Sequence, residues 1–495
     1  MFALDQNLLL PDGSPPPQLL AALLSAQEEL CRKRLNRLHE EYAVRPSILG
    51  RTRGFGLPNN RLAHHYPGYI VSVASGYLVG EPVKYSLADQ PEILQPIRDA
   101  MDRSDCASVD SELAVDAAIY GKGIELCYAD GQAQPRTAQI DPRRSFVVYD
   151  DTVAHAPLFG VTSHDVLNAR LEKQHEVVDV YTAAEHIAYQ RTTPSALTET
   201  SREPHYFAAV PMIEYWNNSQ ETGDFEPVLS LIDAYNTLQS DRLNDKQQFT
   251  DAIMVLKGVG SLGAEDAETE EAPATQEGGT LIRPEQPISE APLTPSERLR
   301  LTKTLFLPGD GADAGFITKP DAESGNELLR QSLSDDIHKF SFVPDLTNEK
   351  FSGDTSGVAM RFKLLGLEQL TKIKERWFRE GLRHRLLCMA QFLATKGMAA
   401  VDVDAVQITF SRSLPVNDLE IAQTAQAYDG MVPRELLLQH IPWVDDPRAA
   451  MEMLEKEQAQ ALQEQQQMFQ TQAFKTGGSG EKPGEPNSKQ KADDA

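Results

Sequence analysis

The chain has 495 residues, 41% of them hydrophobic, and its 73 acidic residues outnumber 47 basic ones to give a formal net charge of −26. Its length predicts about three domains at about 100–200 residues each. So acidic a chain would repel a polyanion, which argues against tight DNA or RNA binding but leaves brief contact with passing DNA open. Charge alone favours an ordinary soluble acidic protein.

Neither the cysteines nor the first residues indicate export or membrane insertion. The four cysteines form no CxxC pair and no zinc-binding spacing with histidine, so we expect reduced thiols, no disulfide and no metal. The start lacks a basic segment before an apolar run, so no secretory signal is expected. No stretch reaches about 18 consecutive apolar residues, so we expect no membrane contact and a product made in the cytoplasm.

The first half of the chain predicts helices followed by strands. Residues 1–17, which include three consecutive prolines, are expected to be disordered. Leucines spaced among charges predict an amphipathic helix over 18–42, and a second helical segment lies within 59–85. From about 112 to 215 the pattern becomes β-like, with an Asp-Gly hairpin turn at 130–131. These segments predict an α+β domain.

The second half predicts long helices separated by an acidic insert. Helical spacing over 226–257 gives a helix about 48 Å long at about 1.5 Å per residue. Residues 261–290 hold eight acids against the single base Arg283 and predict a solvated loop or small exposed subdomain. The remaining predicted elements are a helix over 321–340, a loop over 343–356, a helix of about 60 Å over 357–396, a strand over 401–415, helices over 417–470 and a disordered tail after 471.

The loop before the longest predicted helix raises the question of its purpose. The stretch FVPDLTNEKFSGDTSGVAMRFKLLGLEQL, residues 342–370, passes from an aromatic end through a polar loop into a helix. Gly353 and Gly357 permit unusual backbone angles, and one of the residues 354–356 would cap the helix. Taken alone, the pattern indicates an ordinary helix–loop–helix connection.

The sequence contains no recognisable motif for catalysis or metal binding. Gly-Lys-Gly at 121–123 lacks the spacing and the Ser or Thr of a phosphate-binding loop, so a strand turn is expected. Adjacent His64 and His65 would point in different directions on a helix and are expected to be structural. Asp402 and Asp404 would share one face of a strand, as metal binding requires, yet an exposed edge is the favoured interpretation. We therefore expect no enzyme and no cofactor.

Five blocks of the chain, taken in order, carry a family resemblance. The most specific is VPMIEYWNNSQETGDFEPVLSLIDAYNTLQSDRLND, with its aromatic-Asn-Asn turn, its acidic-aromatic-Glu segment and the helix that follows. The other blocks are NNRLAHHYPGYIVSVASGYLVGEPVKY, AIYGKGIELCYADG, SGVAMRFKLLGLEQL and ITFSRSLPVNDLE. Together they run from about 59 to 455. The chain thereby resembles the portal proteins of tailed bacteriophages, in their siphophage-type branch.

The resemblance implies an α+β portal fold and a ring-shaped homo-oligomer, usually of about twelve subunits with cyclic symmetry. It offers no reason for the acidic insert or for the last residues of the chain. It divides the chain into a disordered N-terminus at 1–17, a wing at 18–225, a stem helix at 226–257, a small α/β clip at 258–320, a second stem helix at 321–342, a tunnel loop at 343–356, the long wing helix and strand at 357–415, an all-helical crown at 416–470 and a disordered tail at 471–495.

The resemblance also implies that the tunnel loop meets DNA. One loop per subunit, pushed inward, would form a ring of weak, sequence-blind phosphate contacts around a central hole. Basic residues after the wing are candidates for mild guidance of DNA, with inter-subunit ion pairs or exposure to water as alternatives. The candidate tunnel-loop residues are Asn348, Lys350, Phe351, Ser352, Asp354 and Thr355, and the candidate channel-lining bases are Arg242, Lys246 and Lys257.

The implied function is that of a phage portal protein, a passive channel at one capsid vertex through which double-stranded DNA is packaged and ejected. Expected partners are further copies of the chain, double-stranded viral DNA held transiently, the terminase motor, the major capsid and scaffolding proteins, and a head-completion or neck protein. The protein would reside in the virion after assembly in the host cytoplasm. Two alternatives stay open: another ring-shaped head-tail connector or adaptor, and an unrecognised enzyme that acts on nucleic acid through Asp402 and Asp404.

Overall fold

The computed structural model describes most of the chain up to residue 412 and scattered parts of the remainder. The chain divides into two compact units, Met1–Ser413 and Leu414–Ala495. In the second unit the described residues include a short helix, α13 (Arg434–Leu438). The described residues are 2–54, 57–87, 91–249, 253–257, 304–307, 311, 313–317, 323–347 and 357–412, together with short stretches between 423 and 460.

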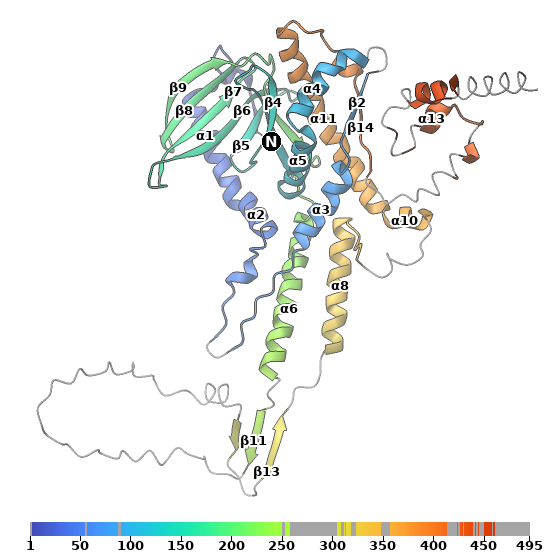
Figure 1. Ribbon diagram of the computed structural model, residues 1–495. Coiled ribbons are helices and arrows are strands. Elements are labelled where there is room, and N and C mark those ends of the chain that lie inside the picture. Colours follow the sequence, from blue (N-terminus) through green and yellow to red (C-terminus); the bar gives the residue numbers. More distant parts are fainter. Residues whose placement is uncertain are drawn as a thin grey trace, which may run out of the picture. The chain divides into compact units, whose positions relative to one another are not determined.

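In the first unit, a long N-terminal helix packs on a six-stranded sheet (Figure 1). The helix runs from Pro17 to Tyr42 and widens into a π-turn in its middle. Leu20 and Leu24 are buried against sheet residues such as Phe146, and each such side chain stabilises the fold by about 1.5–3 kcal/mol. β1 pairs parallel with β5, and the other neighbouring strands are antiparallel. The elements are α1 (Pro17–Leu30), η2 (Cys31–Leu35) and α2 (Asn36–Tyr42), with strands β1 (Phe2–Leu4), β5 (Ser145–Asp150), β6 (Pro157–Leu167), β7 (Lys173–Tyr181), β8 (Glu185–Thr193) and β9 (Ala196–Pro204).

A second apolar core lies between a three-stranded sheet and four helices. The strand order is β10-β3-β4, and the predicted hairpin turn at 130–131 joins β3 to β4. The Asp130 carboxylate folds this turn because it accepts the backbone N–H groups of Gln132 and Gln134, each at 2.9 Å. A two-stranded sheet of β2 and β14 borders the same core. The elements are α3 (Tyr66–Val79), α4 (Gln95–Arg103), α5 (Cys106–Tyr120), α11 (Leu365–Thr395), β2 (Lys84–Ser86), β3 (Lys122–Ala129), β4 (Pro135–Ile140), β10 (Met212–Trp216) and β14 (Gln407–Thr409).

A buried polar network connects four of these elements. Arg385 of α11 is fully buried and pairs with Asp110 of α5 at 2.7 Å and with Glu125 of β3 at 2.8 Å. The hydroxyl of Tyr215 also donates to Glu125 at 2.6 Å. Because two buried carboxylates share one guanidinium, loss of that cation would leave both without their partner. The long helix is therefore fixed to the sheet by charge as well as by apolar packing.

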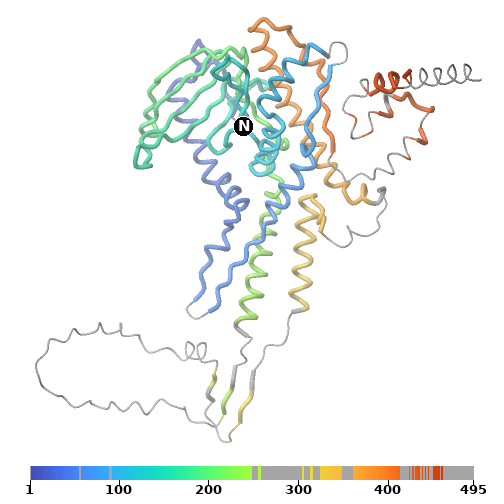
Figure 2. The backbone as a smooth tube through the Cα atoms, in the orientation of Figure 1, coloured from blue at the N-terminus to red at the C-terminus, as the bar shows by residue number. Residues whose placement is uncertain are grey.

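Two helices, α6 (Leu229–Phe249) and α8 (Glu323–Ser341), lie side by side (Figures 1 and 2). The predicted helix over 226–257 is too long, because it ends at Phe249 and residues 253–257 form a strand. The segment is apolar and contains the β-branched residues Ile253 and Val255, which favour a strand over a helix. A three-stranded sheet follows, in which β11 pairs parallel with β12 and antiparallel with β13. Its strands are β11 (Ile253–Lys257), β12 (Thr304–Leu307) and β13 (Asp313–Ile317).

Four other sequence predictions need correction. Residues 1–17, predicted to be disordered, include β1, which pairs with β5, and the buried Ser14. The long helix predicted over 357–396 is interrupted at Leu364, between α10 (Gly357–Lys363) and α11. The β-like region predicted from 112 begins inside helix α5, whose alanine-rich end favours a helix. Asp402 and Asp404 lie in a short 3-10 turn, where the Asp402 carboxylate accepts the Asp404 N–H at 3.1 Å. They are not on a strand, so the shared strand face predicted for them is wrong.

All four cysteines are buried as free thiols. The described residues contain no cluster of three or more His, Cys, Asp or Glu side chains suited to a metal ion. Within the same residues, no helix combines the length and apolar character that a membrane span requires.

Candidate functional site

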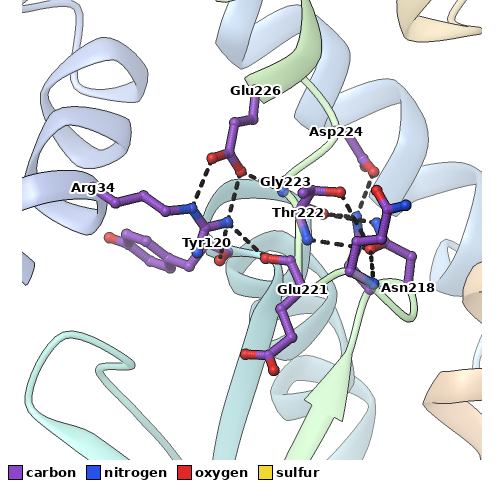
Figure 3. Close-up of polar contacts among 10 residues, drawn as sticks. Arg34, Tyr120, Asn218, Glu221, Thr222, Gly223, Asp224 and Glu226 are labelled. Carbon is purple, nitrogen blue, oxygen red and sulfur yellow. Dashed lines mark hydrogen bonds and ion pairs between the residues drawn. The ribbon is translucent and has the colours of Figure 1, made fainter. Parts of the chain in front are cut away.

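The site begins at the loop that leads from β10 into α6, residues 217–226, which we call the junction loop (Figure 3). Two asparagines fold it. The Asn218 side-chain oxygen accepts the N–H of Thr222 at 3.2 Å, and Asn218 also donates to the Thr222 carbonyl at 2.9 Å. The Asn217 amide donates to the same carbonyl at 2.9 Å and to the Asp224 carboxylate at 2.7 Å. The aromatic-Asn-Asn block of the sequence is therefore a self-bonded turn of the kind that asparagine favours.

Arg34 of the π-turn holds the junction loop from the N-terminal helix (Figure 3). Its Nε and Nη2 donate to the two carboxylate oxygens of Glu226 at 2.7 and 2.6 Å, and Nη2 also donates to the Glu221 carbonyl at 2.6 Å. Bidentate contacts between charged groups are among the strong hydrogen bonds of proteins. Burial acts to raise the pKa of Glu226, but hydrogen bonds from Arg34 and from the Gly223 N–H outweigh burial, so the pKa is lowered. The pair stays charged at neutral pH.

Two glycines let the junction loop lie directly on the end of α5. Gly121 ends that helix in the left-handed region at φ +89°, and a Cβ there would lie 1.8 Å from the Glu221 carbonyl oxygen. A Cβ on Gly223 would lie 2.4 Å from the Ile119 carbonyl oxygen. Both positions require glycine, because any side chain would push the loop off the helix.

A buried ion pair fixes the junction loop to α11. The ammonium of Lys374 contacts the Asp224 carboxylate, with the two side chains only 2% and 1% exposed. The other carboxylate oxygen accepts from Asn217. Such a pair is weak evidence for net stability, yet removing one partner leaves an uncompensated buried charge and costs about 3–5 kcal/mol. The start of α6 is thereby connected to the N-terminal helix, to α5 and to α11.

A segment made of a 3-10 turn, η3 (Ser47–Gly50), and of extended chain at 51–54 and 57–64 runs along α6, and we call residues 47–54 and 57–64 the strap. Three polar side chains of α6, four residues apart, accept hydrogen bonds from the backbone N–H groups of three strap residues that lie two positions apart. Two residues of extended chain advance about 6.6 Å and four residues of helix about 6.0 Å, so the two periods match. The three bonds are Asn60 N–H to Asn244 Oδ1 at 2.6 Å, Leu62 N–H to Ser240 Oγ at 3.0 Å and His64 N–H to Asn236 Oδ1 at 2.9 Å.

Aromatic rings join the end of the strap to both helices of the pair. Tyr66 meets Tyr235 of α6 edge-on at 5.2 Å, and its hydroxyl lies 3.2 Å from the Ser334 hydroxyl of α8. His64 also meets Tyr235 edge-on, at 4.9 Å. Edge-to-face pairs of this kind add about 0.5–1.5 kcal/mol each beyond the area they bury. His64 and His65, predicted to lie on a helix, come just before α3 begins at Tyr66, and His64 packs against Tyr235.

The backbone that follows α8 is held by α3. The hydroxyl of Tyr69 donates to the Pro344 carbonyl and accepts the Leu346 N–H, both at 2.8 Å. His338 Nδ1 lies 2.9 Å from the Val343 carbonyl and must carry a proton, because a carbonyl only accepts. Phe342 turns the chain in the left-handed region at φ 60°, which a bulky residue adopts only at a cost. The segment 343–346 is thus a fixed base for the residues after it.

Residues 22–466 match the family described as "Phage portal protein, SPP1 Gp6-like". The chain belongs to this family of phage portal proteins. The portal protein of Bacillus phage SPP1 is 23% identical over 422 residues, covering 81% of this chain and 77% of the relative. The portal protein of Clostridium phage phiCD119 (strain Clostridium difficile/United States/Govind/2006) is 22% identical over 423 residues, covering 81% and 86%. The resemblance seen in the five sequence blocks is therefore confirmed.

One solved structure, described as "Neck of empty GTA particle computed with C6 symmetry", also resembles the chain. The TM-score is 0.41 at 12% identity, over 75% of this chain and 90% of that one. A likeness this distant supports no conclusion about partners or symmetry.

For this portal family member, the structure does not bring the predicted basic residues together. Arg242 lies on α6 and pairs with Glu327 of α8 at 3.1 Å. Lys246 lies in the last turn of α6 with an exposed side chain. Lys257 is on β11 rather than on a helix, 3.9 Å from the Asp313 carboxylate. The predicted tunnel-loop residues Asn348, Lys350, Phe351, Ser352, Asp354 and Thr355 lie outside the described residues.

The Gly-Lys-Gly segment, predicted to be a strand turn, joins the end of α5 at Gly121 to the start of strand β3. Lys122 begins β3 and is buried, with its ammonium 2.7 Å from the Glu214 carboxylate. Burial acts to raise the pKa of Glu214, but attraction to Lys122 and its hydrogen bond outweigh burial, so the pKa is lowered. A lysine committed to this buried pair has no free charge to offer a phosphate.

Sequence reasoning missed the strap and the buried ion pair. The sequence did contain a signal for the strap. Asn236, Ser240 and Asn244 repeat at four-residue spacing, which places three polar side chains on one face of the helix. The pairing of Asp224 with Lys374 left no local signal, because 150 positions separate the partners.

Proposed function

We propose that the chain is the subunit of a ring at one vertex of a phage head, through which double-stranded DNA enters during packaging and leaves during ejection. The family match over residues 22–466 is the observation that carries the proposal. About twelve copies close the ring by cyclic symmetry. The ring is passive: it binds the major capsid and scaffolding proteins as the head assembles, docks the terminase motor, and later holds a head-completion or neck protein.

The junction loop supports this function because a channel wall must resist force. DNA that moves through a ring pushes on the elements that line it. We call the six-, three- and two-stranded sheets, together with helices α1 to α5 and α11, the α+β body. The bidentate contact of Arg34 with Glu226 and the buried pair of Asp224 with Lys374 fix the start of α6 to this body. We assign α6 and α8 to the stem, and the α+β body to the wing.

In this proposal the tunnel loop, residues 343–356, contacts DNA. Its fixed base at 343–346 supports the proposal, because only the residues after the base would then follow the duplex. Polar side chains would make weak phosphate contacts that carry no sequence information, and a net charge of −26 per chain would limit retention. The proposed contact residues are Asn348, Lys350, Phe351, Ser352, Asp354 and Thr355.

The three basic candidates differ in the exposure of their side chains, which is 18% for Arg242 and 56% for Lys257. The ion pair of Arg242 with Glu327 supports a role between α6 and α8, so we withdraw Arg242 from the DNA-guiding set. Lys246 and Lys257 have exposed side chains, and they remain the proposed channel-lining bases. Their contribution would be modest, since each neutralised phosphate adds only one counterion-release step.

The test combines particle shape with packaging. Negative-stain electron microscopy and the mass of the purified particle should show a closed ring with an opening wide enough for duplex DNA. Deleting residues 348–355, which spares the contacts of Tyr69, should leave the ring unchanged and abolish DNA packaging or retention in infected cells. A chain that remains a compact monomer under all assembly conditions, or a ring without an opening, would overturn the proposal.

A further inference from the structure

The strap carries positive charge in an otherwise acidic chain. The strap contains three arginines, Arg51, Arg53 and Arg61, and no Asp or Glu. Arg51 and Arg53 share the single carboxylate of Asp241. Arg61 is exposed and donates to a backbone carbonyl, and it pairs with no carboxylate in the described part of the chain. The flank of α6 that the strap covers therefore has a net positive charge.

Helix α8 has an exposed face with apolar residues on it. Glu327 and Arg330 point toward α6, where they contact that helix. At about 100° per residue, the opposite side of α8 forms what we call its outer face. Leu328 and Leu329 on this face are 69% and 50% exposed, and neighbouring exposed leucines mark a contact surface. The outer face consists of Leu328, Leu329, Ser332, Asp335, Asp336, Lys339 and Phe340.

The outer face is also acidic. Asp335 and Asp336 form no ion pair with any residue that the structure describes. Lys339 lies on the same face with its ammonium over the ring of Phe340, 5.4 Å from the ring centre, so the two carboxylates leave the face with a net negative charge. A partner for the outer face should therefore bring both positive charge and apolar surface.

The strap and α8 lie on different flanks of α6. Asn236, Ser240 and Asn244 bind the strap, whereas Tyr235 and Arg242 contact α8. On a helix with about 100° per residue, the two sets are centred roughly 150° apart. Figures 1 and 2 show the strap on one side of α6 and α8 on the other. One copy of the chain thus presents a basic flank and, on its other side, an acidic flank.

We propose that the strap of one copy packs on the outer face of α8 of the next copy. The contact rests on the proposed ring, in which every copy must offer two different, complementary surfaces to its neighbours. Exposed Arg61 would meet the carboxylates of Asp335 and Asp336, and Leu49, which is 37% exposed beside it, would help cover Leu328 and Leu329.

A second copy fits the basic flank better than DNA does. The side chains of Arg51 and Arg53 are only 20% and 23% exposed, so they are largely committed to Asp241. Phosphates would leave the exposed leucines of α8 uncovered. Copies that each carry a net charge of −26 repel one another, so their contact needs a local reversal of charge.

The test places the photo-crosslinker p-benzoylphenylalanine at Leu329 in the full chain, with a second variant at Ser332 in case the first fails to assemble. Rings confirmed by electron microscopy are irradiated, and cross-linked peptides are identified by mass spectrometry. We expect a covalent dimer joined to residues 45–64 of another copy. The control variant carries the probe at Val153, which is fully exposed on the α+β body and should give no cross-link to the strap.

The outcomes distinguish a failure of this contact from a failure of the proposed function. Cross-links from α8 to any other part of a neighbour, with rings intact, would overturn the contact and leave the proposed function standing. Wild-type chain that forms no ring would overturn the proposed function first. In a reciprocal experiment the probe replaces Arg61 in rings mixed with duplex DNA. Cross-linking to α8 supports the contact, whereas cross-linking to DNA overturns it.

Discussion

At Asp224, two connections of the junction loop meet in one residue. Its backbone N–H donates to the Ala118 carbonyl at 2.7 Å, and its carboxylate accepts from Asn217 and contacts Lys374. Both charged side chains are almost fully buried, so solvent and salt screen their interaction very little. This residue therefore connects α5 and α11 to the start of α6.

The substitution Lys374→Met should destabilise the fold by about 3–5 kcal/mol, because the Asp224 carboxylate would remain buried without its partner. Denaturant unfolding followed by circular dichroism measures this change. Lys372→Met is the matched control, since that ammonium is 52% exposed and 3.5 Å from Glu368. An exposed pair contributes about 0.2–1 kcal/mol, and a loss of that size for Lys374→Met would contradict the assigned role.

Asp116 should make the stability of the fold depend on pH. Burial raises the pKa of its carboxyl from 3.8 to about 7, although a hydrogen bond from Gln139 acts to lower it. A raised folded-state pKa adds stability that is complete below pH 3.8 and is lost as the pH rises through about 7. Asp116→Asn, which keeps an acceptor for Gln139, should therefore be more stable than the wild type near about pH 8, with the difference shrinking toward about pH 5. Thermal unfolding at both values checks this, and a difference that does not depend on pH would refute it.

Among the helices and the strands, the strap shows how side chains of a helix can bind the backbone of an extended segment. The side chains of Asn236, Ser240 and Asn244 are no more than 1% exposed, so their bonds to the strap are sheltered from water. Because each acceptor binds a backbone N–H, the strap sequence is free to vary at the positions that point outward. This freedom allows the strap to carry arginines in an acidic protein.

Ser240→Ala should loosen the strap on α6. The change leaves the Leu62 N–H without its acceptor at 3.0 Å, which costs about 1–3 kcal/mol. Hydrogen exchange measured by mass spectrometry should be faster in peptides covering 57–66 and unchanged in the sheet strands. Thr237→Ala on the same helix is the control, since that exposed hydroxyl donates only to the Asp233 carbonyl. Equal exchange in the two variants would show that the hydrogen bonds from α6 side chains do not hold the strap on the helix.

For the whole molecule, local signals predicted elements well and long-range pairing poorly. The hairpin turn at 130–131 was predictable because Asp130 folds it with bonds to its own neighbours. The end of the helix at Phe249 was not, because Ile253 and Leu256 continue a helical spacing although they pair in a sheet with β12 and β13. The junction loop was recognisable from its sequence block, whereas its partners Arg34 and Lys374 depend on contacts that only the folded chain creates.

The last prediction concerns how the α+β body controls the proposed tunnel loop. Tyr69→Phe removes the hydroxyl that donates to Pro344 and accepts from Leu346, so the base of the loop loses both bonds to α3. Two lost hydrogen bonds cost about 1–3 kcal/mol, too little to prevent folding of a domain this large. Rings should form normally, while phage complementation should show fewer heads filled with DNA, because the loop would no longer be presented from a fixed base.

Tyr77→Phe provides the control for this experiment. Tyr77 lies on the same helix, but its hydroxyl donates to Glu368 of α11 at 2.8 Å and not to residues 343–346. Loss of that bond leaves Glu368 with Arg412 at 3.3 Å, so packaging should remain at the wild-type level. If both variants packaged equally well, the contacts of Tyr69 would serve the fold alone, and the loop would not depend on a fixed base to act on DNA.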